Sequence, residues 1–293
     1  MNPLGIHALV WAGDIEPSSV ELAARQTRAA GYQFLELSLH DTTQLDVDHA
    51  RTTLAEHGLG VACSRGLAFD ADISSDDPAV VERGARLLRE SVDVAAALGA
   101  RNLCGALYSA LGKYAQPVTR QGYANAVDVL REVAEEAGRC GLGLGIEVVN
   151  RYETHVLNTA AQALRFIDAI GAENVYVHLD TYHMNIEETD LVQPVLDCGD
   201  RLGYIHIGEN HRGYLGAGSI AFGSFFHALQ RIDYRGGITF ESFSSAVVMP
   251  GLCSDLAVWR NLWSDGMDLA VSARAFMQSH LRAAAATVRQ VGS

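Results

Sequence analysis

The chain alternates short apolar segments with longer amphipathic segments along nearly all of its 293 residues. Eight of the apolar segments are predicted to form β-strands. These strands are expected at residues 4–10, 33–39, 59–64, 101–107, 142–149, 174–180, 202–208 and 236–242. The amphipathic segments predict helices near residues 18–30, 47–57, 78–98, 119–140, 159–170, 189–199, 223–232 and 255–285. Eight strands, each followed by a helix, are the number that closes a single (β/α)₈ barrel, the TIM barrel.

A doubly wound open sheet is the alternative, because alternation alone does not prove that a barrel closes. Two observations favour the barrel: the strands recur at a nearly regular interval, and no GxGxxG motif follows the first strand. Several predicted helices end on a glycine, as helix C-caps do; these are Gly31, Gly58, Gly99, Gly141 and Gly171. No linker-like stretch interrupts the pattern, so we expect one domain over residues 1–293 with an extended C-terminal helix.

Composition narrows the class of protein. The formal charge of −13 argues against nucleic-acid binding, which depends on Lys and Arg beside phosphates. No signal peptide is evident at the N-terminus and no run of 18 apolar residues suggests a membrane span. The five cysteines form no CxxC motif, which predicts free thiols and no thiolate zinc site. We therefore expect a cytoplasmic protein without membrane or nucleic-acid partners.

Four polar residues stand out because each lies at the end of one of the last four predicted strands. They are Glu147, Asp180, His206 and Glu241, each about one βα unit from the next. In a barrel their side chains would meet at the C-terminal mouth, where barrel enzymes have their active sites. Three carboxylates and an imidazole in a poorly solvated pocket require a cation. Oxygen-rich ligands suit Mn²⁺, Co²⁺ or Mg²⁺. The alternative is four unrelated polar residues with local hydrogen bonds.

A second set follows the same strands. Glu153, His183 and Arg212 lie in the loops after Glu147, Asp180 and His206, where substrate-positioning groups belong. Singly, each could be an ordinary surface residue. Other features predict less specific roles: a flexible active-site loop at 213–219, a core histidine with satisfied hydrogen bonds at His178, small core residues at Cys63 and Cys104, and either a lining or a capping role for His40 and Asp41.

Four segments carry a family resemblance, at residues 146–164, 178–188, 206–220 and 240–245. They closely resemble the D-tagatose 3-epimerase family, which includes D-allulose (D-psicose) and L-ribulose 3-epimerases, among the xylose isomerase-like barrels. The resemblance implies that Glu147, Asp180, His206 and Glu241 bind one divalent ion per subunit, without an organic cofactor. It also implies that Glu153, His183 and Arg212 hold the C1–C2 end of a sugar.

The chain departs from some family members near the far end of the sugar. His7 replaces a tyrosine, and the segment at 108–114 lacks a tryptophan. We therefore expect His7 to contact substrate, and we expect both departures to affect the choice of sugar.

The resemblance implies a metal-dependent epimerase that interconverts free ketoses at C3 through a cis-enediolate. The candidate pairs are D-fructose and D-allulose, L-ribulose and L-xylulose, or D-tagatose and D-sorbose, with Glu147 and Glu241 as acid and base. A hydroxypyruvate isomerase, an aldose–ketose isomerase and a non-catalytic sugar-binding barrel are the alternatives. The apolar face of the helix at 270–288 could pack on the barrel or on a second subunit, and relatives of this type imply a homodimer or homotetramer.

Overall fold

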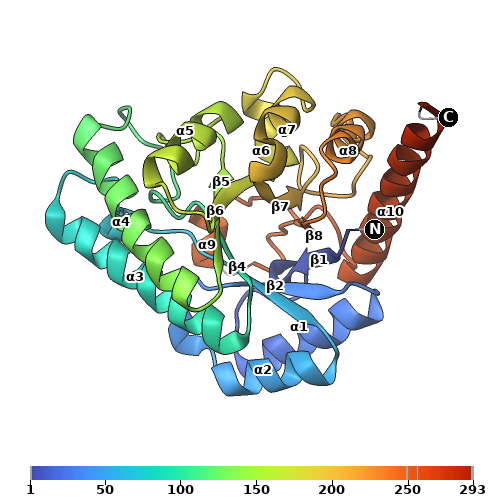
Figure 1. The fold of residues 1–293 in the computed structure, drawn as a ribbon. Coiled ribbons are helices and arrows are strands. Elements are labelled where there is room, and N and C mark those ends of the chain that lie inside the picture. Colours follow the sequence, from blue (N-terminus) through green and yellow to red (C-terminus); the bar gives the residue numbers. More distant parts are fainter. Residues whose placement is uncertain (1, 249, 256, 292–293) are drawn as a thin grey trace.

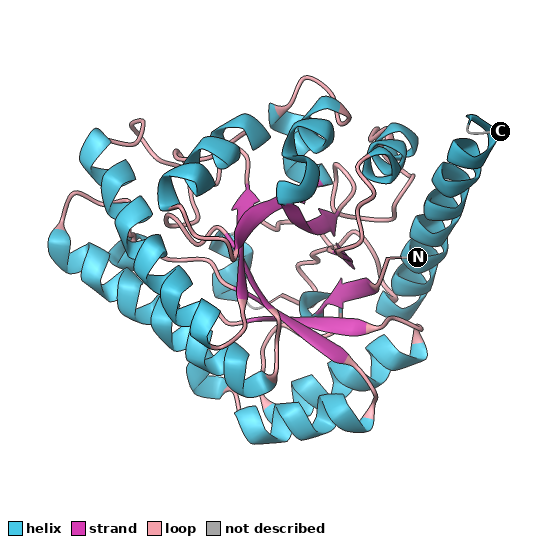
Figure 2. Cartoon of the chain, in the orientation of Figure 1, coloured by secondary structure: helices cyan, strands magenta, loops and turns pink. Residues whose placement is uncertain are grey.

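Eight parallel strands form a closed barrel in the order of the sequence (Figures 1 and 2). The computed structural model describes residues 2–248, 250–255 and 257–291. The first strand pairs with both the second and the last, so the sheet has no free edge. The strands are β1 (Leu4–His7), β2 (Phe34–Ser38), β3 (Gly60–Ser64), β4 (Asn102–Gly105), β5 (Gly143–Val148), β6 (Val175–Asp180), β7 (Leu202–Ile207) and β8 (Gly237–Phe240). The predicted barrel is confirmed, and the open sheet is excluded.

Most helices surround the strands on the outside of the barrel (Figure 2), and a short one at 250–255 lies at the mouth. They are α1 (Pro17–Ala29), α2 (Val47–Glu56), α3 (Pro78–Leu98), α4 (Arg120–Arg139), α5 (Ala160–Ile170), α6 (Thr181–Glu187), α7 (Gln193–Cys198), α8 (Phe222–Arg231), α9 (Pro250–Asp255) and α10 (Gly266–Val291). Glycine ends α3 and α5 as predicted: Gly99 and Gly171 adopt the left-handed conformation that closes a helix without steric cost. The long C-terminal helix α10 packs against α8 and β8 of its own barrel.

Four helix predictions need correction. The expected helix at 189–199 is the shorter α7, and neither α6 nor α9 was predicted. Helix α6 forms because the Asp180 side chain accepts a hydrogen bond from the amide of Tyr182 and so caps it. The expected helix at 255–285 begins later, at Gly266, because Asp265 accepts hydrogen bonds from the amides of Met267 and Asp268.

The inside of the barrel changes from aromatic to polar along its axis. Near the N-terminal ends of the strands, the rings of Phe34 and Tyr176 fill the interior beside strands that carry glycine. A Cβ at Gly5 would lie 2.1 Å from the Phe34 ring, and one at Gly203 would lie 2.2 Å from the Tyr176 ring. Side chains alternate between the two faces of a strand, so the next inward positions carry Glu36 on β2 and His178 on β6. The packed aromatic layer near the N-terminal ends of the strands thus supports a polar layer nearer their C-terminal ends.

Among the residues that the structure describes, no helix combines the length and apolar character needed to cross a membrane. All five cysteines are free thiols, as predicted, and Cys63 and Cys104 are buried core residues.

The capping box that begins α5 should contribute measurably to stability. Thr159 accepts a hydrogen bond from the amide of Gln162, whose side chain accepts one from the amide of Thr159. Replacing Thr159 by Ala removes the hydroxyl acceptor, so we expect the free energy of unfolding in urea to fall by about 1 kcal/mol. The Thr159→Ser variant retains the hydroxyl and should stay close to wild type. Equal losses in both variants would contradict a role for the cap.

Candidate active site

The four predicted ligands meet at the C-terminal mouth of the barrel. Glu147 lies in β5, Asp180 ends β6, His206 lies in β7 and Glu241 directly follows β8. One ligand atom from each of Glu147, Asp180 and His206 lies within 4.8 Å of the others. His206 Nδ1 is 3.4 Å from Glu147 Oε1 and 3.3 Å from Glu241 Oε1. Four side chains from four successive strands therefore share one centre, and their role as ligands stays a prediction.

His206 has the hydrogen-bonding pattern of a metal ligand. Its Nε2 lies 3.0 Å from both carboxylate oxygens of Glu36. Its Nδ1 is buried, faces the carboxylates and has no hydrogen-bond partner among the described residues. Metal-binding histidines commonly use one nitrogen for the ion while the other contacts a carboxylate. The set of three carboxylates and one imidazole therefore fits a divalent ion of the Mn²⁺, Co²⁺ or Mg²⁺ type.

Burial and crowding shift the pKa values of these groups. Burial raises the pKa of Glu147 to about 7, with further upward contributions from Glu241 and Asp180 and an opposing one from His206. Burial likewise raises the pKa of Asp180. Burial would also raise the pKa of Glu241, but His206 and Arg212 outweigh it and hold that pKa below its usual value. The centre thus needs positive charge to keep all three carboxylates ionised.

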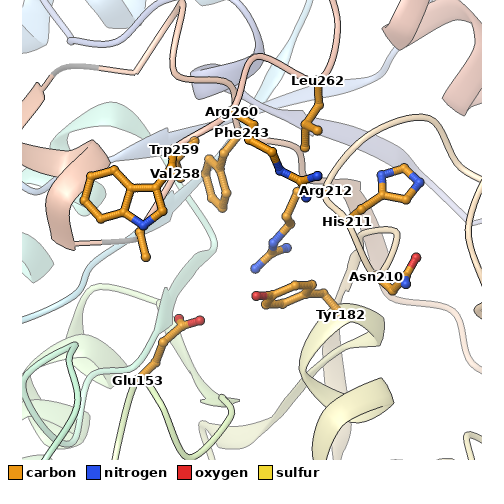
Figure 3. Close-up of a pocket in the computed structure, with 11 residues that line it drawn as sticks. Glu153, Tyr182, Asn210, His211, Arg212, Phe243, Val258, Trp259, Arg260 and Leu262 are labelled. Carbon is orange, nitrogen blue, oxygen red and sulfur yellow. The ribbon is translucent and has the colours of Figure 1, made fainter.

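Arg212 supplies part of this charge. Its Nη1 donates to Asp180 Oδ2 at 2.9 Å and to Glu241 Oε2 at 2.6 Å. The guanidinium lies between the rings of Tyr182 and Phe243, at 3.9 and 5.0 Å from their centroids (Figure 3). Its backbone has φ = 60°, a left-handed conformation that is unfavourable for arginine and concentrates at functional sites. Arg212 therefore contacts the predicted ligands directly, in addition to lining the adjacent cavity.

Glu153 and His183 lie beside the centre, with His183 Nε2 3.4 Å from Arg212 Nη2, and both contact Asn150. The Asn150 side chain donates to Glu153 Oε1 at 2.8 Å and lies 2.8 Å from His183 Nδ1, which also accepts from the Asn150 amide at 3.1 Å. His183 Nε2 is 3.6 Å from Asp180 Oδ2. Burial raises the pKa of Glu153 to about 6, although Arg212 opposes the shift. Asn150 thus fixes the orientation of two predicted substrate contacts.

One cavity of about 960 Å³ connects these groups to solvent. Seven of the eight predicted site residues line it, and the eighth, Asp180, is fully buried; the seven are His7, Glu147, Glu153, His183, His206, Arg212 and Glu241. His7 ends β1, where its Nε2 lies 3.3 Å from Ser64 Oγ. A smaller pocket of about 150 Å³ shares Glu153 and Arg212 and is bordered by Trp259 (Figure 3).

Several secondary predictions have mixed outcomes. His178 is buried, but neither ring nitrogen has a hydrogen-bond partner among the described residues, so the prediction of a satisfied core histidine is wrong. No residue of 213–219, a fully described segment, lines the cavity. That loop is held by Glu209, which accepts from the Gly216 amide at 2.8 Å. His40 and Asp41 line the cavity, and Asp41 also caps the 3₁₀ turn at Thr42–Gln44.

Sequence reasoning missed Glu36, Asn150, Tyr182 and Phe243. Glu36 could have been found, because a charged residue in the middle of the apolar strand at 33–39 is unusual. The other three carry no such signal, since a loop asparagine and two aromatic residues are ordinary in a sequence of this kind.

Comparisons with known proteins identify the family of the chain. The family model described as xylose isomerase-like TIM barrel matches residues 24–284. The ketose 3-epimerase of Arthrobacter globiformis is 49% identical over 96% of this chain and 97% of its own length. The L-ribulose 3-epimerase of Methylomonas sp. is 49% identical over 94% of this chain and 96% of its own length.

Solved structures of related enzymes have the same fold. The crystal structure of D-allulose 3-epimerase from Methylomonas sp. has a TM-score of 0.94 at 48% identity, covering 96% of this chain and 98% of that one. The structure of an L-ribulose 3-epimerase has a TM-score of 0.97 at 42% identity, covering 100% and 99%. The chain belongs to the xylose isomerase-like TIM barrel family. Within that family it falls among the ketose 3-epimerases, a group of isomerases that act on sugars.

The position of Arg212 depends on a glycine. A Cβ at Gly208 would lie 2.9 Å from Arg212 Nη1, the flexible end of that side chain. The Gly208→Ala variant should therefore fold normally but displace the guanidinium, lowering kcat/KM for ketoses by about 10-fold to 100-fold. Gly223→Ala is the matched control, because a Cβ there meets no atom within 4 Å. Wild-type kinetics in Gly208→Ala would show that this position of Arg212 is not needed for turnover.

Proposed function

We propose that the protein is a metal-dependent 3-epimerase of free ketoses. The observation that supports this most strongly is the convergence of Glu147 from β5 and Glu241 after β8 on one nitrogen of His206. Two carboxylates that approach one point from different strands can act on the two faces of a sugar carbon. Relatives named for L-ribulose and D-allulose make these ketoses, with D-fructose and D-tagatose, the first substrates to test.

The ion would be held by Glu147, Asp180, His206 and Glu241, and the proposal includes no organic cofactor. When bound, a divalent ion supplies Lewis-acid polarisation of the C2 carbonyl and stabilises the negative charge that develops on O2. Manganese, cobalt and magnesium all suit this donor set.

The two glutamates would carry the proton transfers. In one direction, one glutamate removes the proton from C3, and the electron pair moves into a cis-enediolate of the substrate. The other glutamate then delivers a proton to the opposite face of C3, which inverts that carbon. In the reverse direction the roles exchange. Positioned acid and base groups of this kind commonly contribute about 10²-fold to 10⁴-fold to a rate.

The other residues that line the cavity would hold the sugar in a fixed orientation. Glu153 and His183, fixed by Asn150, would bind the oxygens at C1 and C2, and Arg212 would add positive charge at the same end. His7 lines the same cavity beside Ser64, and we assign it to the far end of the sugar. Orientation of this kind accounts for a large part of many enzymatic accelerations.

The cytoplasmic location and the homodimer or homotetramer expected from the sequence stay predictions. Light scattering would measure the mass in solution.

Solvent exchange tests the reaction directly. In D₂O the enzyme should place deuterium at C3 of both the ketose and its epimer, because the proton passes through carboxyl groups that exchange with water. Mass spectrometry with NMR assigns the labelled carbon. Deuterium at C1 alone would instead indicate an aldose–ketose isomerase or a hydroxypyruvate isomerase type of reaction, and no turnover of any ketose would favour a binding protein.

Steady-state kinetics of two variants test the roles of the two glutamates in proton transfer. Glu147→Gln and Glu241→Gln should each lower kcat by at least about 100-fold. Glu173→Gln is the control, because Glu173 is exposed and precedes the N-terminal end of β6, far from the mouth. Activity above a few per cent of wild type in either variant would remove that glutamate from acid–base duty.

Metal removal should affect both activity and stability. An ion that binds only the native state adds about 2.7 kcal/mol to the free energy of unfolding when its concentration is 100 times Kd. Chelation should therefore lower Tm and abolish turnover, and Mn²⁺ or Co²⁺ should restore both. An unchanged Tm after elemental analysis has verified metal loss would contradict a tight site.

A further inference from the structure

His206 belongs to two groups of potential metal ligands. One group is the oxygen-rich set with Glu147 and Asp180, and the other joins His206 to Cys104 and His178 inside the barrel. In each group one ligand atom per residue lies within 4.8 Å of the others. The second group offers a thiol and imidazoles, which favour Zn²⁺ and other thiophilic ions. Two sites of opposite preference therefore compete for one imidazole.

Glu36 contacts both His206, which the two groups share, and Cys104, which belongs to the second group. Both of its oxygens are 3.0 Å from His206 Nε2, and Oε1 is 3.8 Å from Cys104 Sγ. Glu36 is completely buried, and Oε2 accepts a hydrogen bond from the Tyr204 hydroxyl at 2.7 Å. That hydroxyl also lies 2.6 Å from Thr239 Oγ1, so a hydrogen-bonded chain fixes the carboxylate.

This contact decides which nitrogen of His206 can bind a metal. An ionised carboxylate only accepts hydrogen bonds, so a Glu36 carboxylate requires the proton of His206 to be on Nε2. A nitrogen that carries a proton cannot be a ligand, and the free lone pair is then on Nδ1. Nδ1 is the nitrogen that faces Glu147 and Glu241. His206 then has no lone pair left to serve as the third ligand of the group with Cys104 and His178.

We propose that Glu36 is a positioning residue that commits His206 to the oxygen-rich site and so sets the metal preference of the protein. With Glu36 in place, hard divalent ions bind through Nδ1, and Cys104 and His178 remain without the third ligand that a thiophilic ion needs. The inference rests on the proposed function for the location of the ion. It adds a residue and a selectivity that the epimerase mechanism alone does not require.

The test compares Mn²⁺ and Zn²⁺ binding to metal-free wild type and Glu36→Gln by isothermal titration calorimetry. Gln has the same shape but no charge, so it no longer requires the proton on Nε2. Loss of such a partner typically weakens metal binding by about 10-fold to 100-fold. We expect Mn²⁺ affinity to fall by this factor while Zn²⁺ affinity falls less or rises. Unchanged Mn²⁺ affinity, or equal losses for both ions, would overturn the proposal.

Cobalt spectroscopy identifies the ligands independently of activity. Co²⁺ bound to a thiolate gives an intense near-ultraviolet charge-transfer band. We expect no such band in wild type, a band in Glu36→Gln, and its loss in the double variant Glu36→Gln/Cys104→Ser. Glu173→Gln is the matched control, because it makes the same exchange at an exposed residue that precedes β6; its Mn²⁺ to Zn²⁺ ratio should stay close to wild type.

If Glu36→Gln does not fold, Glu36→Leu offers an apolar replacement of similar size, since exchanging buried charges for apolar groups is often tolerated. A thiolate band in wild-type Co²⁺ protein would refute the proposal without any variant. A protein that binds Mn²⁺ selectively but leaves no deuterium at C3 would refute the epimerase function while this proposal stands.

Discussion

The electrostatics of the barrel mouth depend on how buried negative charge is balanced. Four carboxylates, including Glu36, lie within contact of His206 or Arg212, and all are nearly excluded from water. Carboxylates in this environment protonate unless cations face them. The Arg212 guanidinium and one predicted metal ion meet that demand. The positions of Tyr182 and Phe243 around the guanidinium follow from the same need, because they hold Arg212 against two of the acids.

The rest of the barrel supports this charged layer. Aromatic rings pack against glycines in the N-terminal half of the interior, and the polar residues begin at the next inward position of the strands. Closure of the sheet matters because an open sheet would expose these groups to water and relax their pKa shifts. The register of β5 to β8 then brings side chains from different strands to one height. A single residue of slippage in any of these strands would turn its ligand outward.

The sequence was sufficient to predict the barrel and to place the residues that meet at its mouth, because both depend on periodic features. Strands recur regularly, and polar residues such as Glu147 and Asp180 end apolar runs. Hydrogen bonds between distant segments leave no periodic trace, so the pairing of Asn150 with His183 and the contact of Glu36 with His206 were not foreseen. The missed helix α6 has a local origin, because its cap is the hydrogen bond that Asp180 accepts from the Tyr182 amide. The position of Asp180 at the end of an apolar run predicts a ligand, and that pattern gives no sign of its second role as a helix cap.

All four residues of the predicted metal centre come from β5 to β8, whereas the wall formed by β1 to β4 contributes His7, Ser64 and their neighbours. In the proposed enzyme, β5 to β8 thus carry the metal ligands, and the wall of β1 to β4, here called the recognition half, faces the far end of the sugar. Changes in the recognition half can alter which sugar is accepted while the reacting groups keep their spacing. A duplicated gene can therefore acquire a different sugar preference through substitutions in the loops after β1 to β4, while the reacting groups stay unchanged.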